Sequence, residues 1–121
     1  MRKTILSIFS ILSFFISINV NSQNSSTIQS LIDSANIGEQ LMIPAGTYEE
    51  SLIIDKSVIL EADGEVILDV SGFNTGILIE SNTSDVTIRG FTINGDDQTG
   101  SGITVSPGAA NITIVNNNIS N

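Results

Sequence analysis

The chain contains no cysteine, no histidine and no tryptophan. Without cysteine it forms no disulfide, so an exported domain of this size depends on packing alone. Without histidine it lacks the usual general base and the usual ligand for transition metals, which argues against nucleophilic catalysis by a histidine-activated residue. Without tryptophan it lacks the largest of the flat apolar rings on which sugars stack.

Basic residues are also scarce. The sequence has 4 Lys and Arg against 13 Asp and Glu, and its net charge is −9. Such a surface repels nucleic acids and anionic lipids, so neither is expected as a partner. It also disfavours polyanionic sugars unless a divalent cation bridges the two surfaces.

The N-terminal segment has the pattern of a signal peptide. Arg2 and Lys3 precede an apolar stretch over residues 5–20, and Val20-Asn21-Ser22 forms a cleavage site before Gln23. The alternative is a retained membrane anchor, but the serines and the asparagine within this stretch make it a poor span. We therefore expect residues 1–22 to be removed and the protein to be secreted, either extracellular or periplasmic.

The rest of the chain carries apolar pairs at i and i+2 that recur every 25 to 28 residues. The i, i+2 spacing is that of a strand with one buried face. The first row is Leu41/Ile43, Val66/Leu68, Phe91/Ile93 and Asn117/Ile119; the second is Leu52/Ile54, Ile77/Ile79 and Ile103/Val105; the third is Val58/Leu60, Val86/Ile88 and Ile112/Ile114. Three strands per repeat predict an all-β, single-stranded parallel β-helix, a solenoid with three parallel sheets, over residues 41–121.

A short helix is expected before the first strand, within residues 23–40. Ser26 and Gln29 have the spacing of a capping box, apolar residues follow at helical spacing from Ile28 to Ala35, and Gly38 is a natural stop. The helix could cap the first coil or be an ordinary helix packed on a sheet face; its position directly before the first strand favours the cap. Residues 44–48 have the composition of a turn.

The bends between third-row and first-row strands differ in length. We expect Gly90 and Asn116 to share one corner with a positive φ, because glycine and asparagine tolerate that backbone conformation. Asn117 falls at the inward position that Phe91 holds one repeat earlier. A stacked, hydrogen-bonded asparagine and a one-residue slip in register both fit this pattern.

Several segments resemble right-handed parallel β-helix proteins of the pectin-lyase-like superfamily and the NosD-type repeats. They are Thr27-Ile28-Gln29-x-x-Ile32-Asp33-x-Ala35, Ile43-Pro44-Ala45-Gly46-Thr47-Tyr48, Ile54-x-Lys56-Ser57-Val58-x-Leu60, Val86-Thr87-Ile88-Arg89-Gly90-Phe91-Thr92-Ile93 and Asn111-Ile112-Thr113-Ile114-Val115-Asn116-Asn117-Asn118-Ile119. The resemblance extends from Thr27 to Asn121 and implies a right-handed helix. It implies little about function, because the superfamily includes lyases, hydrolases, esterases, adhesins and inert stalks.

A lyase-like site, as the resemblance implies, would need acidic residues around Ca²⁺ and a nearby Arg or Lys. Asp55 and Glu80 occupy the same outward position on adjacent coils, and Asp96 and Asp97 lie in a glycine-rich loop. These four residues are the candidate Ca²⁺ ligands; the alternative is that they are ordinary solvated carboxylates. Arg89 belongs to another strand row, and a lone Lys56 is expected only to aid solubility.

No catalytic residue is predicted, because the acids form no cluster of the kind that glycoside hydrolases use. The outward pair Ile53 and Leu78 is expected to pack beneath a loop or a neighbouring segment. We therefore expect a non-catalytic adhesion, glycan-contacting or scaffold module. The alternative is the N-terminal fragment of an extracellular polysaccharide lyase or glycoside hydrolase.

The end of the sequence carries the repeat in full register through residues 117–121. An uncapped coil leaves aliphatic side chains and strand edges open. We therefore expect either further coils of a longer chain or a self-stacking partner at this end.

Overall fold

The computed structural model describes residues 27–121, so the predicted signal peptide, residues 1–22, lies outside the described residues. The described part is mostly β-strand, with one short helix, α2, at Ile28–Ser34. The helix lies within the predicted range of residues 23–40 and has 7 residues. Across residues 27–121, no helix has the length and apolar character needed to cross a membrane.

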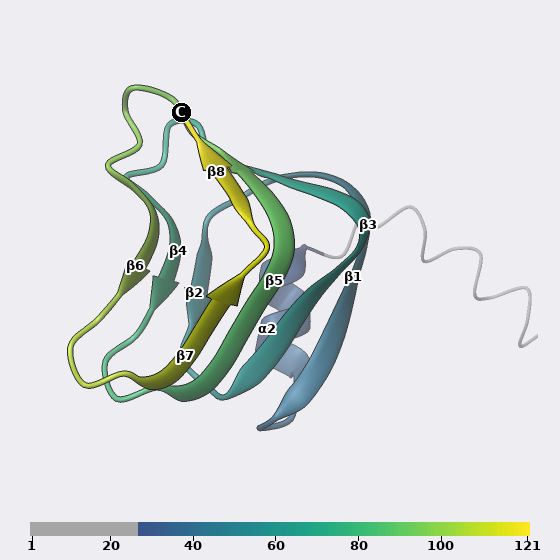
Figure 1. Ribbon diagram of the computed structural model, residues 1–121, viewed down its shortest axis with the longest axis vertical. Helices are drawn as coiled ribbons and strands as arrows, with labels where there is room; N and C mark the ends of the chain where they lie inside the picture. The colour runs from purple at the N-terminus through teal and green to yellow at the C-terminus, as the bar shows by residue number, and fades with distance from the viewer. Residues whose placement is uncertain (1–26) are drawn as a thin grey trace, which may run out of the picture.

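Eight strands form two parallel sheets (Figure 1). The strands are β1 (Glu39–Glu49), β2 (Leu52–Ile54), β3 (Val58–Asp69), β4 (Thr75–Ile79), β5 (Ser84–Asn94), β6 (Ser101–Val105), β7 (Ala110–Val115) and β8 (Asn118–Ser120). One sheet has the order β1-β3-β5-β7, with β8 also paired to β5, and the other has the order β2-β4-β6. The prediction of an all-β chain with parallel sheets is confirmed.

The chain passes back and forth between these two sheets, and every strand pairs with the strand of the preceding circuit. In the three-stranded sheet Ile54 lies opposite Ile79, and Ile79 lies opposite Val105. In the larger sheet, Leu60 and Ile88 are partners, as are Ile88 and Ile114. The second and third predicted rows are therefore in the predicted register.

The prediction of three sheets is wrong, because the first and third rows belong to one sheet. The long strands β1, β3 and β5 each run through a corner without ending. Gly64 and Gly90 take positive φ angles of 96° and 84° at this corner, which bends the backbone while pairing continues on both sides. Four residues of β3 between Glu61 and Val66 lie opposite Gly90 as a bulge.

The predicted start of the first row, Leu41/Ile43, is also wrong. Leu41 is opposite Leu60 in the third row, and the first row begins instead with Tyr48, opposite Leu68. Residues 44–48, expected as a turn, are part of β1. Pro44 is tolerated there because β1 is an edge strand, where the missing N–H need not donate to a ladder.

The predicted corner is confirmed at both of the predicted residues, Gly90 and Asn116, which lie on adjacent strands. Asn116 has a φ of 58° and follows Gly90 along the stack. Asn117 is the stacked, hydrogen-bonded asparagine and not the product of a register slip. Its Oδ1 accepts from the N–H of Phe91 at 2.8 Å, and its Nδ2 donates to the carbonyl of Ile88 at 2.9 Å.

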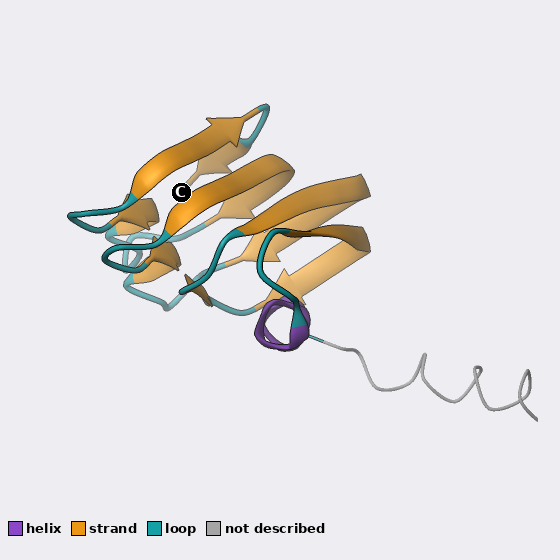
Figure 2. Cartoon of the chain, turned by 90° about the horizontal axis from the view of Figure 1, so that it is seen from below, coloured by secondary structure: helices purple, strands orange, loops and turns teal. Residues whose placement is uncertain are grey.

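Helix α2 closes one end of the strand stack (Figure 2). Ile28, Ile32 and Ala35 are buried and belong to the same core cluster as the inward residues of the strands. The helix therefore acts as the predicted cap, since its apolar side covers the first circuit. Its N-cap is Thr27, whose side chain accepts from the N–H of Ser30, and not Ser26.

Three side chains fasten α2 to the first circuit. The carboxylate of Glu50 accepts from the N–H groups of Ile28 and Gln29 at 2.8 and 3.1 Å. The amide of Gln29 accepts from the N–H of Ile53 and donates to its carbonyl, so it occupies the edge of β2. Lys56 donates to the carbonyls of Asp33 and Ala35 near the helix C-terminus. Lys56 is thus a structural residue, contrary to the prediction.

We expect Glu50→Ala to lower the free energy of unfolding by about 1–2 kcal/mol, because two N–H groups at the helix N-terminus lose a charged acceptor. Urea unfolding followed by circular dichroism measures this loss. The adjacent Glu49→Ala is the matched control, since Glu49 is exposed and its replacement should change the free energy little. Equal effects of the two substitutions would contradict the assigned role of Glu50.

Candidate functional site

Asp55 and Glu80 lie side by side, as the sequence predicts. Each follows the last residue of its strand, Ile54 and Ile79, which are partners in the three-stranded sheet. The N–H of Glu80 donates to the carbonyl of Ile54 at 2.9 Å, which continues the pairing past the strand end. Asp55 is exposed and Glu80 is half-buried. The two residues are therefore neighbours on adjacent strands, and each is open to solvent at least in part.

Asp96 has a structural role in the loop between β5 and β6. Its Oδ1 accepts from the N–H of Gly72 at 3.2 Å, in the turn one circuit earlier, and from the N–H of Gln98 at 3.0 Å. The hydroxyl of Thr99 lies 3.1 Å from the same oxygen and 3.1 Å from the carbonyl of Val70. Asp96 therefore ties its own loop to the loop below. No local pattern predicts the contact with Gly72, because Gly72 is 24 residues away from Asp96.

The four candidate Ca²⁺ ligands do not form one site. Asp55 and Glu80 follow the C-terminal ends of β2 and β4, whereas the loop of Asp96 and Asp97 lies at the N-terminal ends of β4 and β6. Over residues 27–121, no three acidic side chains come together in a group able to hold a metal ion. Calcium binding by either pair stays a prediction.

Hydrogen bonds lower the pKa of two loop carboxyls. For Asp96 the largest cause is the backbone N–H of Gly72, which stabilises the charged form. The pKa of Asp69 is lowered first by the side chain of Ser71 and then by its backbone N–H. Both carboxylates thus favour the folded state when ionised.

Arg89 is placed away from the candidate acids. It lies opposite Glu61 on the adjacent strand, and its Nε is 3.7 Å from a Glu61 carboxylate oxygen. Both side chains are partly exposed, so this ion pair adds little to stability. The expectation that Arg89 cannot serve Asp55 and Glu80 agrees with this position across the circuit.

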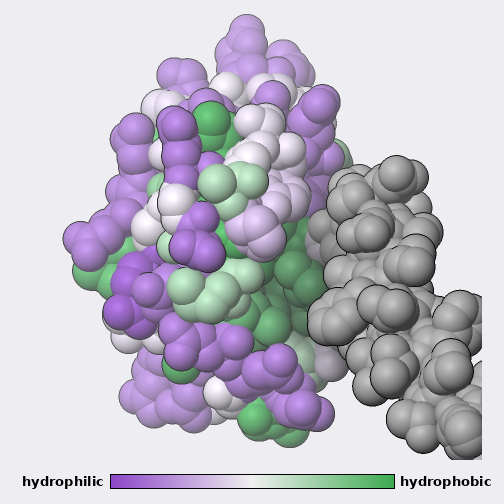
Figure 3. Space-filling view, turned by 90° about the vertical axis from the view of Figure 1, so that its right-hand side faces the viewer, coloured by the Kyte–Doolittle hydropathy of each residue, from purple (hydrophilic) through white to green (hydrophobic). Residues whose placement is uncertain are grey.

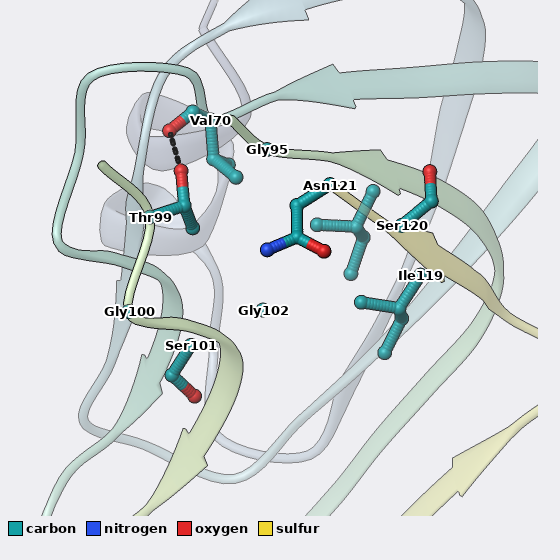
Figure 4. A pocket seen from close by; sticks show the side chains of 10 residues that line it. Val70, Gly95, Thr99, Gly100, Ser101, Gly102, Ile119, Ser120 and Asn121 are labelled. Atoms are coloured by element: carbon teal, nitrogen blue, oxygen red, sulfur yellow. Dashed lines mark hydrogen bonds between the residues drawn. The ribbon is translucent and has the colours of Figure 1, made fainter. Parts of the chain in front are cut away.

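One hollow of about 120 Å³ lies at the β8 end of the stack (Figure 4). Its walls include Val70, Ile93, Ile119 and Asn121, together with Gly95 and residues 99–102, which run from the loop into β6. Figure 4 shows the Asn121 side chain between this loop and β8. None of the lining residues is charged. The hollow therefore contains no pair of groups suited to acid–base chemistry.

The outward pair Ile53 and Leu78 is in register on the three-stranded sheet. Ile53 is 47% exposed, while its backbone is bonded to the side chain of Gln29. Gln29 of α2 thus covers the backbone edge of β2 and leaves the Ile53 side chain partly in solvent. The expectation is a covering loop or neighbouring segment; among the described residues α2 is the segment that contacts β2, through Gln29.

The comparisons with known proteins give no relative for this chain. No protein-family model matches it, and neither a curated protein nor a solved structure matches it. The resemblance to pectin-lyase-like and NosD-type repeats therefore stays a prediction that is carried by the motifs alone.

The lowered pKa of Asp96 predicts an acid-dependent loss of stability. Because the folded-state pKa lies below the ordinary value of 3.8, the stabilisation is complete above that value and is lost as the pH falls through the folded-state pKa. Asp96→Asn should therefore melt at a lower temperature than the parent at pH 7, and the difference should shrink toward pH 2.

The matched control for this experiment is Asp97→Asn. Asp97 is exposed and makes no hydrogen bond or ion pair to any residue in 27–121. Its replacement should leave the melting temperature nearly unchanged across the same pH range. A constant difference for Asp96→Asn from pH 7 to pH 2 would contradict the electrostatic cause.

Calcium binding at Asp55 and Glu80 is tested by calorimetric titration and by melting in millimolar CaCl₂. If the pair holds Ca²⁺, the melting temperature rises with CaCl₂, and Asp55→Asn and Glu80→Gln each abolish the rise. Asp97→Asn separates the two candidate pairs, since it should leave a site at Asp55 intact. If the titration shows no heat of binding and CaCl₂ does not raise the melting temperature, Asp55 and Glu80 do not form a Ca²⁺ site.

Proposed function

We propose that the chain is a right-handed parallel β-helix that acts outside the cytoplasm as a non-catalytic scaffold and glycan-contacting module. The alternation of the chain between two parallel sheets supports the solenoid, because each circuit returns one strand spacing further along the stack. Connections between parallel strands are nearly always right-handed, which supports a right-handed winding of the chain. The N-terminal motif of residues 1–22 supports export.

The observation that carries the proposal is that several polar side chains hold one segment of the chain to another through hydrogen bonds. Glu50, Lys56, Asp96 and Asn117 each bond to backbone groups of another element. Side chains engaged in this way hold a rigid frame and are not poised for proton transfer. The function is then carried by the outer faces of the rigid strand stack.

The outer face of the large sheet supports contact with glycans. Thr87 and Thr113 are neighbours on β5 and β7, and Thr92 and Asn118 are neighbours on β5 and β8. These outward hydroxyl and amide groups provide donors and acceptors on both sides of the corner at Gly90 and Asn116. The acidic surface disfavours anionic sugars, so a neutral glycan is the ligand class that fits. Figure 3 shows one side of the molecule, on which hydrophilic side chains surround a smaller hydrophobic area.

The proposal is tested by binding to an array of neutral and anionic polysaccharides. We expect binding to neutral chains only, and Thr87→Val with Thr113→Val should weaken it about five-fold or more through lost hydrogen bonds. Thr47→Val is the matched control, because Thr47 is outward and exposed on β1, two strands from β5. Preference for anionic chains, or equal loss in the control, would contradict the proposed face.

The alternative function, part of a polysaccharide lyase or hydrolase, predicts turnover. Incubation of a full-length parent that includes this chain with pectin, alginate and chondroitin should release no new reducing ends and no unsaturated products if the module is non-catalytic. Release of either product that is lost on substitution of residues in later coils of the parent would favour the alternative.

A further inference from the structure

Three polar side chains from three neighbouring strands meet on the outer face of the large sheet. Gln40, Glu61 and Arg89 are outward residues of β1, β3 and β5, and Glu61 is the pairing partner of Arg89. The Gln40 amide donates to Oε1 of Glu61 at 3.1 Å, and the same oxygen lies 3.7 Å from Nε of Arg89. Strands β3 and β5 are each paired on both sides. The Glu61–Arg89 pair therefore lies in the middle of the sheet and away from both of its edges.

The guanidinium of Arg89 has donors that no group in residues 27–121 accepts. Its Nε is buried and makes no hydrogen bond. The Glu61 oxygen at 3.7 Å is too far away for one, and the terminal nitrogens of Arg89 donate to no residue in this range. Arginine carries five N–H donors and no acceptor. Because the side chain is 43% exposed, its outer donors face solvent and can reach a ligand.

The second cation among residues 27–121, Lys56, is engaged within the fold. It donates to the backbone carbonyls of Asp33 and Ala35. Arg89 is therefore the one cation of the described part of the chain whose donors are available to a ligand. It also lies two residues after Thr87 on the same side of β5, in the face proposed above for glycan contact.

Glu61 supplies an acceptor beside these donors. Its Oε1 accepts from Gln40, while its Oε2 accepts no hydrogen bond from residues 27–121. The side chain is 30% exposed, so a ligand can approach it. A carboxylate accepts hydrogen bonds and does not donate them, whereas a guanidinium donates and does not accept. The pair therefore offers both kinds of hydrogen bond at one place on the sheet.

A sugar with two adjacent hydroxyl groups, a vicinal diol, matches this pair. Each hydroxyl both donates and accepts, so the diol can accept from Arg89 and donate to Glu61 at the same time. A carboxylate group of an acidic sugar would satisfy Arg89 but would lie beside the like charge of Glu61. An apolar group would cover both charged groups and leave their hydrogen bonds unmade. The chemistry of the pair thus favours a neutral sugar.

We propose that Glu61 and Arg89 form a binding site for the vicinal diol of a neutral sugar unit. Arg89 donates to the diol, Glu61 accepts from it, and Thr87 extends the contact along β5. This inference rests on the proposed glycan-contacting function and deepens it, because it names the two charged side chains that select the sugar and the hydroxyl pattern that they require.

The ligand side is tested by treating the neutral polysaccharides with periodate and then with borohydride. Periodate cleaves the carbon–carbon bond between adjacent hydroxyl groups, so it destroys vicinal diols. Dextran and galactomannan contain such diols, whereas the linkage of curdlan leaves no adjacent hydroxyls along its chain. We expect dextran and galactomannan to bind the chain and to lose binding after treatment, and curdlan not to bind.

The outcomes separate this site from the function on which it rests. If treated polysaccharides bind as tightly as the untreated ones, or curdlan binds as tightly as dextran, the diol site is wrong while the glycan-contacting function stands. If no neutral polysaccharide binds, both proposals fail.

The protein side is tested by substitutions at the pair, with the dissociation constant measured by calorimetric titration with dextran and galactomannan. Arg89→Gln should raise the constant about ten-fold or more, because hydrogen bonds from a charged donor are lost. Arg89→Lys keeps the charge but lacks the planar set of donors, so we expect a rise of about five-fold. Glu61→Gln should cause a rise of about five-fold through loss of the charged acceptor.

Asp97→Asn is the matched control, because it removes the same charge as Glu61→Gln from an exposed loop residue outside the strands of the large sheet. It should leave the dissociation constant nearly unchanged. Circular dichroism checks that each variant folds, and the weak surface ion pair makes loss of folding unexpected. Unchanged affinity in Arg89→Lys, or an equal loss in Asp97→Asn, would show that only overall charge matters and would overturn the site.

Discussion

The structure depends on one constraint, which is that each layer of inward aliphatic side chains is buried only by the layers next to it. Ile54, Ile79 and Val105 form one such column. The exposed fraction of the side chain is 44% at Val105 and 0% at the two inner positions. Parallel pairing in register provides the contact and the hydrogen bonds together. A layer that lost this register would turn its apolar face to solvent.

The ends and corners follow from the same constraint. The first layer has no strand before it among the described residues, and α2 fills that place with apolar side chains while Gln29 occupies the strand edge. Gly90 and Asn116 turn the strands at a positive φ so that the next inward position stays in line. Asn117 shows that a polar residue fits an inward position when backbone groups satisfy its amide.

The features predicted correctly from the sequence are those set by short spacing. The i, i+2 pairs located the second and third rows and all of the first row except its start at Leu41/Ile43, and the preference of Gly and Asn for positive φ located the corner. Leu41 was assigned to the wrong row because 44–48 has a turn-like composition, yet an edge strand accepts Pro44. The contacts of Glu50, Lys56 and Asp96 were missed because their partners are more than 20 residues away, and no local pattern encodes them.

The most direct test of layer-by-layer burial is native-state hydrogen exchange of this chain, resolved by residue. The account predicts slowest exchange for the paired amides of β3 and β5, which have strands on both sides, and faster exchange for β7 and β8, which pair on one side only among the described residues. Exchange in β7 and β8 as slow as in β3, or uniformly fast exchange throughout residues 39–120, would contradict it.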